Sequence, residues 1–503
     1  MVPSFLTRPM ELWYRLIREL LSARTKGTLV CRCRCHCSES GMTTTLVLPS
    51  HVSTQIDRAT REYVETAGVL IASVVETARG DLRILVQDII WVDDDAYQVR
   101  EHDRLTIASH GYVPALGEAE RRGSTALWFH THPGGDGVPL PSRCDLEVDR
   151  EISDLFRLRT GSPFYGAVIA SPRPKGIAFS GTLQRDEEAP IKIDRAWFVG
   201  DQLHLTPTSD SPIAAPLPMF DRNIRAFGPD IQRVLGDLRV GIVGCGGTGS
   251  AVAEQLIRLG IRDLMLIDPD RLSLSNITRV YGSNPTRIGD LKVDVLKDHL
   301  CLIALNLKCT TSSSMITLEH AARGLTDCDV VFGCTDDNAG RLVLSRFATY
   351  LMTPVFDLGV LLSSEDGGQL TGIDGRITIL GPGAACLVCR GRVDMARAAA
   401  ELLTPEERRV RADEGYAPAL VGIEPAVVAF TTAVAAAAVN ELLERLIGYG
   451  AQPRPTEILL RLHEREISIN IAAPRRGHYC DPDEQILGRA NQLPFLGQAW
   501  PNL

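Results

Sequence analysis

Two histidines, a carboxylate and a hydroxyl stand close together near residue 140 of this 503-residue chain. His130 and His132 are two residues apart, and Asp145 follows in the segment that begins at Ser142. Side chains alternate along a strand, so two histidines at this spacing point to the same side and can bind one metal ion. With Asp145 they supply three ligands and leave a fourth position for water, which is the arrangement of a catalytic zinc. We therefore expect hydrolytic chemistry here.

A zinc-bound water also needs a partner that takes its proton. Zinc lowers the pKa of this water to about 7, so hydroxide becomes available at neutral pH. A carboxylate that is not itself a ligand suits the role of base. Glu65 is the candidate, because it stands just before an apolar run to Ser73 that is typical of a strand.

Together these residues resemble the motif of the JAMM (JAB/MPN) metallopeptidases. That motif is a glutamate on an early element, then His-x-His-Pro, a spacer and Ser-x-x-Asp. The resemblance implies zinc on His130, His132 and Asp145, Glu65 as general acid/base, and Ser142 as a hydrogen-bond donor to the tetrahedral intermediate. The alternative is a scaffolding copy of the same fold that carries out no metal chemistry.

A glycine-rich loop after the apolar run 238–243 marks a second site. Glycines let the chain turn tightly and bring backbone N–H groups and a helix N-terminus against phosphate. Asp268 ends the next apolar run, at the spacing of a carboxylate that binds a ribose hydroxyl. Taken alone, this pattern predicts a Rossmann-like dinucleotide site. The glycines of the loop are Gly244, Gly246, Gly247 and Gly249.

Polar residues further along favour a nucleoside triphosphate over a nicotinamide cofactor. Asn276, Arg279 and Lys292 add hydrogen-bond donors and positive charge where a triphosphate needs them. Asp336 follows the apolar run 330–332, at the kind of strand end where open α/β sheets bind ligands. A carboxylate in that place can bind Mg²⁺.

The whole set resembles the ThiF/MoeB/ubiquitin-activating superfamily, which adenylates the C-terminal glycine of ubiquitin-like proteins. The resemblance implies ATP and Mg²⁺ as cofactors, and a dimer in which Arg222 reaches the γ-phosphate bound by the neighbouring subunit. Asn223 stands where the family usually has glutamine. The implied nucleotide ligands are the four glycines and Asp268 with its companion Asp270, the phosphate ligands are Asn276, Arg279 and Lys292, and the magnesium-linked catalytic aspartate is Asp336.

The cysteines of this second region predict a structural zinc. Cys386 and Cys389 have the spacing of half a tetrahedral site. The resembled family closes this site with a second CxxC, whereas here only Cys480 follows, with His478 before it and Asp483 where another cysteine could stand. We expect His478 to be the fourth ligand, because imidazole is a common partner of thiolates. The alternative is a set of structural cysteines without metal.

No cysteine lies between Arg390 and Tyr479, where conjugating members of the family carry the one that forms a thioester. We therefore expect the adenylate to pass to an outside nucleophile, such as a sulfur donor or a conjugating enzyme. A residue of this chain other than cysteine is the alternative acceptor.

Length and composition agree with a division into two parts, and the two resemblances imply that both are catalytic domains of α/β class. We expect an unassigned arm over 1–41, a JAB/MPN α/β domain over 42–200, a Pro/Ser-rich linker over 201–218, and a Rossmann-like ThiF/MoeB adenylation domain over 219–490. The formal net charge of −9 offers no basic surface for nucleic acid. The apolar stretch 425–439 is shorter than the roughly 20 residues that span a membrane, so we expect a buried helix there.

These features predict a bifunctional enzyme. One half would process or deconjugate a ubiquitin-like protein by zinc hydrolysis, and the other would adenylate its C-terminal glycine. Two alternatives remain: sulfur-carrier activation in cofactor biosynthesis, and an adenylating enzyme whose first domain only binds substrate. Because the other cysteines are typical of thiols and metal ligands, we expect a cytoplasmic protein.

Overall fold

The computed structural model describes residues 42–501 except 136, 175, 209–216, 305, 365–369, 404–406 and 408–425. Residues Ser40–Leu503 belong to one compact unit. The predicted arm 1–41, much of the predicted linker and Pro425, the first residue of the predicted buried helix, lie outside the described residues.

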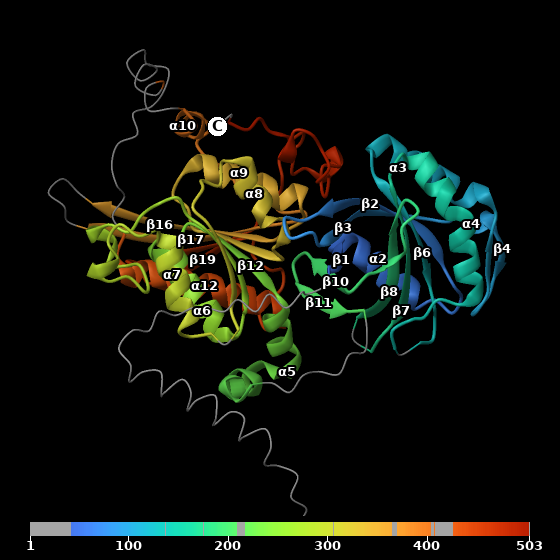
Figure 1. The fold of residues 1–503 in the computed structure, drawn as a ribbon, viewed down its shortest axis with the longest axis horizontal. Coiled ribbons are helices and arrows are strands. Elements are labelled where there is room, and N and C mark those ends of the chain that lie inside the picture. Colours follow the sequence, from blue (N-terminus) through green and yellow to red (C-terminus); the bar gives the residue numbers. More distant parts are fainter. Residues whose placement is uncertain are drawn as a thin grey trace, which may run out of the picture. The chain divides into compact units, whose positions relative to one another are not determined.

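A nine-stranded mixed sheet forms the N-terminal half, in the order β11-β10-β1-β3-β2-β6-β7-β8-β9. Side chains alternate along β2, so Leu70 packs in one buried cluster with α2, while Val69 packs in another with α3 and α4. Both faces of the sheet are thereby covered (Figure 1). The elements of this half are β1 (Thr44–Pro49), α2 (Ser50–Thr60), β2 (Ala67–Glu76), β3 (Leu82–Trp91), β4 (Tyr97–Arg100), β5 (Leu105–Ile107), α3 (Val113–Arg122), β6 (Thr125–Thr131), α4 (Arg143–Thr160), β7 (Phe164–Pro172), β8 (Ile177–Arg185), β9 (Ile191–Lys192), β10 (Arg195–Val199) and β11 (His204–Pro207).

An eight-stranded sheet in the order β14-β13-β12-β15-β16-β17-β18-β19 forms the C-terminal half. The first five of these strands are parallel, and the last three continue the sheet as antiparallel strands. From β12 the chain adds β13 and β14 on one side of the sheet and then returns to add β15 and β16 on the other side of β12. The strand order therefore reverses between β12 and β15, as in a Rossmann-like sheet. The predicted α/β fold class is confirmed. The elements of this half are α5 (Asp221–Asp237), β12 (Arg239–Val243), α6 (Gly247–Leu259), β13 (Asp263–Ile267), α7 (Lys292–Cys301), β14 (Lys308–Ser312), α8 (Glu319–Gly324), β15 (Val330–Gly333), α9 (Asn338–Tyr350), β16 (Val355–Ser364), β17 (Leu370–Leu380), α10 (Met395–Glu401), α12 (Val428–Ile447), β18 (Glu457–Arg461) and β19 (Glu466–Asn470).

The apolar stretch near residue 430 is a helix packed on the sheet, as predicted, and it runs eight residues further to Ile447. Charged residues in this extension stay buried because they are paired: Arg445 Nε lies 2.9 Å from Glu441 Oε1, and Arg454 Nε lies 2.8 Å from Glu444 Oε2. In the part of the chain that the structure describes, no helix is long and apolar enough to cross a membrane.

The N-terminal sheet continues past the predicted domain boundary at residue 200. β11 pairs with β10 in an antiparallel hairpin, with Trp197 opposite Leu205. The predicted linker 201–218 therefore begins inside this sheet. At the other end, Phe495 and Leu496 are buried in the core of the C-terminal half, beyond the predicted boundary at residue 490.

Ion pairs join the two sheets. Asp329, which is fully buried, accepts hydrogen bonds from Arg195 Nη2 at 2.9 Å and from Arg83 Nη1 at 3.2 Å. Burial opposes ionisation of Asp329, yet these two arginines hold the pKa of its carboxyl below its usual value. Arg79 Nη1 lies 2.7 Å from Asp263 Oδ2, and Arg239 pairs with Asp81. On the C-terminal sheet, these contacts gather at the strand ends where β12, β13 and β15 begin.

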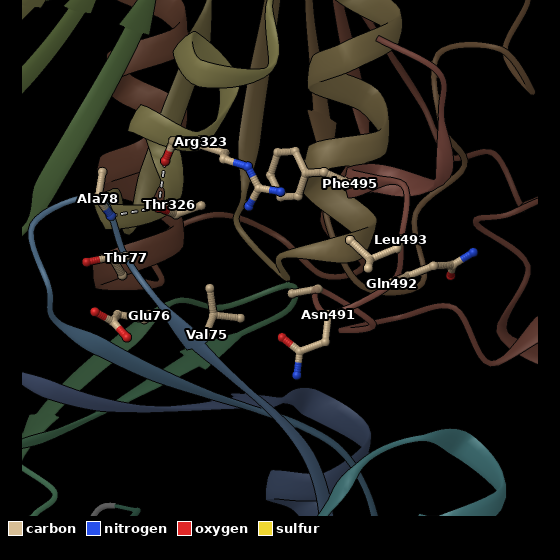
Figure 2. A pocket seen from close by; sticks show the side chains of 11 residues that line it. Val75, Glu76, Thr77, Ala78, Arg323, Thr326, Asn491, Gln492, Leu493 and Phe495 are labelled. Carbon is tan, nitrogen blue, oxygen red and sulfur yellow. Dashed lines mark hydrogen bonds between the residues drawn. The ribbon is translucent and has the colours of Figure 1, made fainter. Parts of the chain in front are cut away.

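The C-terminal tail, which includes Gly488 and Phe495, adds a second contact between the halves. Figure 2 shows the turn after β2, where Ala78 N donates to Thr326 Oγ1 at 3.3 Å. Beside it, the Arg323 guanidinium carbon lies 4.1 Å from the centroid of the Phe495 ring. Gln87 Nε2, on β3, donates to the backbone oxygen of Gly488 at 3.3 Å. The tail is thus held by both halves.

Candidate functional site

The structure brings the predicted ligands of the N-terminal metal site together. His130 lies on β6, and His132 follows directly after this strand. Their Nε2 atoms are 3.1 Å apart, and Asp145 Oδ1 and Oδ2 lie 3.3 Å and 3.5 Å from the Nε2 atoms of His130 and His132. The three groups offer atoms that all lie within 4.8 Å of one another.

Asp145 is positioned by the start of α4. Ser142 is the N-cap of this helix: its Oγ accepts from Asp145 N at 3.1 Å, and its backbone N donates to Asp145 Oδ2 at 2.6 Å. This reciprocal capping box fixes the carboxylate. Burial opposes ionisation, but hydrogen bonds from His130 and His132 hold the pKa of Asp145 well below its usual value. The cap leaves the hydroxyl proton of Ser142 available for donation.

Glu65 stands beside these three groups, two residues before β2. Its Oε1 lies 3.9 Å from His132 Nε2, so it is near the histidines, but it does not belong to the group of three ligand residues. Burial raises the pKa of the Glu65 carboxyl. Arg100 Nε donates to the backbone oxygen of Glu65 at 3.1 Å, and Thr66 N donates to Thr131 Oγ1 at 2.9 Å. These bonds tie the Glu65 segment to the strand that carries the histidines.

The donor set fits zinc. Two imidazole nitrogens face each other at 3.1 Å with a carboxylate against both of them. The lone pairs of these nitrogen and oxygen atoms repel one another unless protons or a cation lie between them. Two histidines and one carboxylate are a common ligand set of catalytic zinc, with a remaining position for water.

The second predicted site forms a cavity of about 350 Å³ at the carboxyl ends of the parallel strands. In open α/β sheets this is the edge that binds ligands. The predicted residues that line it are Gly244, Gly246, Gly247, Asp268, Asp270, Arg279, Lys292 and Asp336.

Two of the loop glycines are required by the backbone. Gly244 has a φ of 91°, and a Cβ there would lie 2.6 Å from the backbone oxygen of Cys334. Gly249 does not line the cavity: a Cβ on it would lie 1.8 Å from the oxygen of Gly244, so its role is close packing of α6 against the loop. Gly246 caps α6, whose first N–H groups have no partner within the helix. The start of α6 can therefore bind phosphate.

Charged groups surround the rest of the cavity. Asp268 accepts from the backbone nitrogens of Cys245 at 2.6 Å and Asp270 at 2.8 Å, and burial raises the pKa of its carboxyl. Lys292 Nζ lies 2.6 Å from Asp270 Oδ2. The guanidinium of Arg279 and the ammonium of Lys292 give this wall its positive charge.

The two neighbouring aspartates after β15 have different positions. Asp337 is the N-cap of α9 and accepts from Gly340 N, and the hydroxyl of Thr335 also donates to it. Both aspartates line the cavity, but Asp336 takes no part in this cap. The Asp336 carboxylate is therefore the better candidate of the two to bind a ligand.

Besides Gly249, two predicted nucleotide ligands lie outside the cavity. Asn276 is buried, and its Oδ1 accepts from Ser273 N at 3.1 Å within a short turn. Arg222 is exposed in the first turn of α5 and does not line this chain's cavity. Its predicted role requires the cavity of a second chain.

The predicted structural zinc ligands converge as well. Cys386 Sγ lies 3.4 Å from His478 Nδ1, and Cys389 Sγ lies 3.6 Å from Cys480 Sγ. All four atoms lie within 4.8 Å of one another, and Asp483 is not part of the group. A hydrogen bond from the Cys480 thiol lowers the pKa of Cys386 to about 4. Three thiols and one imidazole form a set that zinc binds tetrahedrally.

Sequence reasoning missed several residues of the cavity wall. Arg341 and Thr431 contribute polar groups, and Met315 and Ile316 contribute an apolar side. Arg341 comes five residues after Asp336, so it reaches the cavity only because α9 begins immediately after the aspartates. Thr431 comes from the distant helix α12, which nothing in the local sequence connects to this site.

The C-terminal half matches the ThiF family over residues 220–481, which is more than half of the chain. The chain therefore belongs to the ThiF family. Residues 1–219, including the first metal site, precede the matched region.

Curated relatives are similar over about 30% of this chain. Molybdopterin-synthase adenylyltransferase of Escherichia coli (strain K12) is 32% identical over 148 residues, which are 29% of this chain and 58% of the relative. Ubiquitin-like modifier-activating enzyme 5 of Oryza sativa subsp. japonica is 30% identical over 30% of this chain and 38% of the relative. Adenylyltransferase and sulfurtransferase uba4 of Aspergillus terreus is 30% identical over 30% of this chain and 33% of the relative. The chain thus spans less than two thirds of each relative's length.

Among solved structures, Escherichia coli MccB with ATP is 15% identical to this chain, with a TM-score of 0.42. The similarity covers 53% of this chain and 75% of that one.

Proposed function

We propose that the C-terminal half adenylates the C-terminal glycine of a ubiquitin-like or sulfur-carrier protein, using ATP and Mg²⁺. The observation that carries this proposal is the cavity that brings together the glycine loop, Lys292, Arg279 and Asp336. The names of the relatives, a molybdopterin-synthase adenylyltransferase and a ubiquitin-like modifier-activating enzyme, support the same reaction class.

In this reaction a carboxylate oxygen bonds to the α-phosphorus of ATP, and the bond from that phosphorus to pyrophosphate breaks. The N–H groups at the start of α6 hold phosphate oxygens, and Lys292 and Arg279 neutralise the charge of the triphosphate. Asp336 would hold Mg²⁺, and the bound ion would supply electrostatic stabilisation of the leaving pyrophosphate. Asp268 binds the ribose through its remaining lone pairs, since each of its oxygens already accepts one backbone N–H.

The test is ATP–pyrophosphate exchange with small proteins that end in Gly-Gly and are encoded beside this gene. Exchange that depends on one such protein would support adenylation of its terminal glycine. The same protein with a C-terminal amide is the matched control and should support no exchange. Absence of exchange with every candidate would reject the proposed substrate class.

We propose a second activity for the N-terminal half: zinc-dependent hydrolysis that exposes or releases the same terminal glycine. The observation that carries it is the convergence of His130, His132 and Asp145 beside Glu65. Zinc bound there would supply an activated water at neutral pH. Glu65 would then take the proton of this water, and Ser142 would donate a hydrogen bond to the tetrahedral intermediate.

A precursor with extra residues after its terminal glycine tests this second activity. Wild type should show a lag before exchange begins, because the glycine carboxylate must first be exposed. Glu65→Ala should show no exchange with the precursor and normal exchange with trimmed substrate. If Glu65→Ala activates the precursor as wild type does, the hydrolase does not act before activation. Its role would then be later deconjugation, or substrate binding alone.

We also propose a cytoplasmic homodimer with a structural zinc at Cys386, Cys389, His478 and Cys480. A conjugating enzyme or a sulfur donor takes the adenylate. The identity of this partner indicates the pathway. A partner that delivers persulfide sulfur would favour cofactor biosynthesis, and a conjugating enzyme would favour protein modification. Co-purification followed by mass spectrometry distinguishes the two.

A further inference from the structure

A buried carboxylate behind the wall of the nucleotide cavity has two arginine partners. Asp357, on β16, is completely buried. Arg376 Nη2 lies 2.6 Å from its Oδ2, and Arg341 Nε lies 3.5 Å from its Oδ1. Both arginine side chains are 17% exposed. One negative charge therefore faces two positive charges, and the group keeps a surplus positive charge near the surface of the cavity.

The two arginine side chains lie closest to the cavity at Gly359. This glycine is directly opposite Arg376 in the β16–β17 pair, and it lines the cavity together with Arg341. A Cβ on Gly359 would lie 3.4 Å from Arg376 Nη2 and 3.5 Å from Arg341 Nη2. Both guanidinium groups thus border the space that the missing side chain leaves free. The Nε atoms of Arg341 and Arg376 are buried without a hydrogen-bond partner among the described residues.

The position of this group separates it from the phosphate ligands. In the sheet order β13-β12-β15-β16, the glycine loop follows β12, Asp336 follows β15, and Gly359 lies on β16. Gly359 is therefore on the side of Asp336 away from the glycine loop. The reaction has a second anion besides the triphosphate, which is the carboxylate that attacks it.

We propose that Arg341, positioned by Asp357, binds the terminal carboxylate of the protein substrate beside Asp336. This inference rests on the proposed adenylating function. A guanidinium can hold one carboxylate oxygen and leave the other free to attack the α-phosphorus. Pyrophosphate then leaves with the electron pair of the broken bond, and no proton has to move. Gly359 keeps the approach to the guanidinium open.

The experiment measures the KM for ATP and for the protein substrate separately, in exchange assays with the Gly-Gly protein that wild type activates. Arg341→Gln should raise the KM for the protein about tenfold or more, because a hydrogen bond to a charged group contributes about 1.5–3 kcal/mol. The KM for ATP should stay within about twofold of wild type. Arg341→Lys keeps the charge and should recover part of the loss.

Gly359→Ala tests the same contact without changing any charge. Its methyl group would stand at ordinary contact distance from both guanidinium groups, so the variant should fold. It should raise the KM for the protein and leave ATP binding, measured by calorimetry, unchanged. Arg461→Gln is the control, because Arg461 is 43% exposed on β18 and pairs with a surface glutamate.

The outcomes separate this inference from the proposed function. An unchanged KM for the protein in Arg341→Gln would overturn the inference and leave adenylation standing. A raised KM for ATP alone would assign Arg341 to the triphosphate and also overturn it. If wild type shows no exchange with any carboxyl-terminal Gly-Gly protein, the proposed function fails first and the inference fails with it.

Discussion

The two candidate sites are built in different ways. The N-terminal site consists of side chains on one strand end and one helix start, held by a capping box at Ser142. The C-terminal site combines backbone, in the glycine loop and the start of α6, with charged side chains that several elements far apart in the sequence bring to one cavity. A compact set of side chains can be recognised from residue types at short spacing. A site assembled from many elements is recognised from their order over a long stretch, here residues 220–481.

The largest expected effect is the loss of one activity while the other is retained, which would show that the two sites act separately. His130→Ala combined with His132→Ala removes two of three zinc ligands, so hydrolysis should fall to background and the zinc content should decrease. Pyrophosphate exchange with trimmed substrate should stay nearly intact, because the nucleotide cavity shares no residue with the metal site. Metal analysis and both assays on folded protein provide the measurement. Loss of both activities together would show that the two sites act as one.

The second effect lies within the nucleotide cavity. Asp336→Ala should reduce exchange by about 10²–10³-fold, as loss of transition-state electrostatics does. Asp337→Ala should mainly remove the N-cap of α9, with a loss of about 1 kcal/mol in the free energy of unfolding. Exchange rates and thermal unfolding of both variants test this difference. A greater loss of exchange in Asp337→Ala than in Asp336→Ala would show that Asp337, and not Asp336, is the residue that binds magnesium.

The third effect concerns the contact between the two halves. Asp329→Ala leaves Arg83 and Arg195 buried without their carboxylate, which should cost about 3–5 kcal/mol in the free energy of unfolding. Asp57→Ala is the control, since its pair with Arg61 is on the surface and should contribute far less to the free energy of unfolding. Calorimetry of both variants gives the values.

This contribution also has a defined pH dependence. The folded-state pKa of Asp329 is below its value of about 3.9 in the unfolded chain. Its stabilisation is therefore complete above that unfolded value and is lost as the pH falls through the folded pKa. The difference between wild type and Asp329→Ala should shrink on acidification below about pH 4. A difference that grows toward acid would reject this assignment.

The smallest effect tests whether Arg222 acts across a dimer. Arg222→Ala and Asp336→Ala chains should each be inactive in exchange, and mixed dimers retain one complete site. Random mixing should restore about a quarter of wild-type exchange, since half of the dimers are mixed. Sedimentation shows whether dimers form, and differently tagged chains show that mixing occurred. No recovery in mixed dimers would place Arg222 outside the neighbouring cavity.

Sequence reasoning found the residues whose chemistry is local. The two metal sets have ligands two or three residues apart, and the structure gathers them together with the distant Asp145, His478 and Cys480. It could not find residues that tertiary packing delivers, such as Thr431 from α12 or the Asp357–Arg341 pair. It also assigned Asn276 to phosphate as a hydrogen-bond donor that matches the family's motif, whereas Asn276 does not line the cavity and its amide oxygen accepts from Ser273 N within its own turn.

The direction of the strands at the junction has a consequence for how a substrate moves. The ion pairs between the halves are at the amino ends of β12, β13 and β15, whereas the nucleotide cavity is at their carboxyl ends. In the N-terminal half, Arg83 begins β3 at the junction, while Glu65 and His130 lie near the opposite ends of β2 and β6. The two candidate sites of one chain thus lie at strand ends away from the junction. If both proposed activities hold, a trimmed protein would have to leave the first site and diffuse before it enters a second one, in the same molecule or another, so added trapping protein should intercept it.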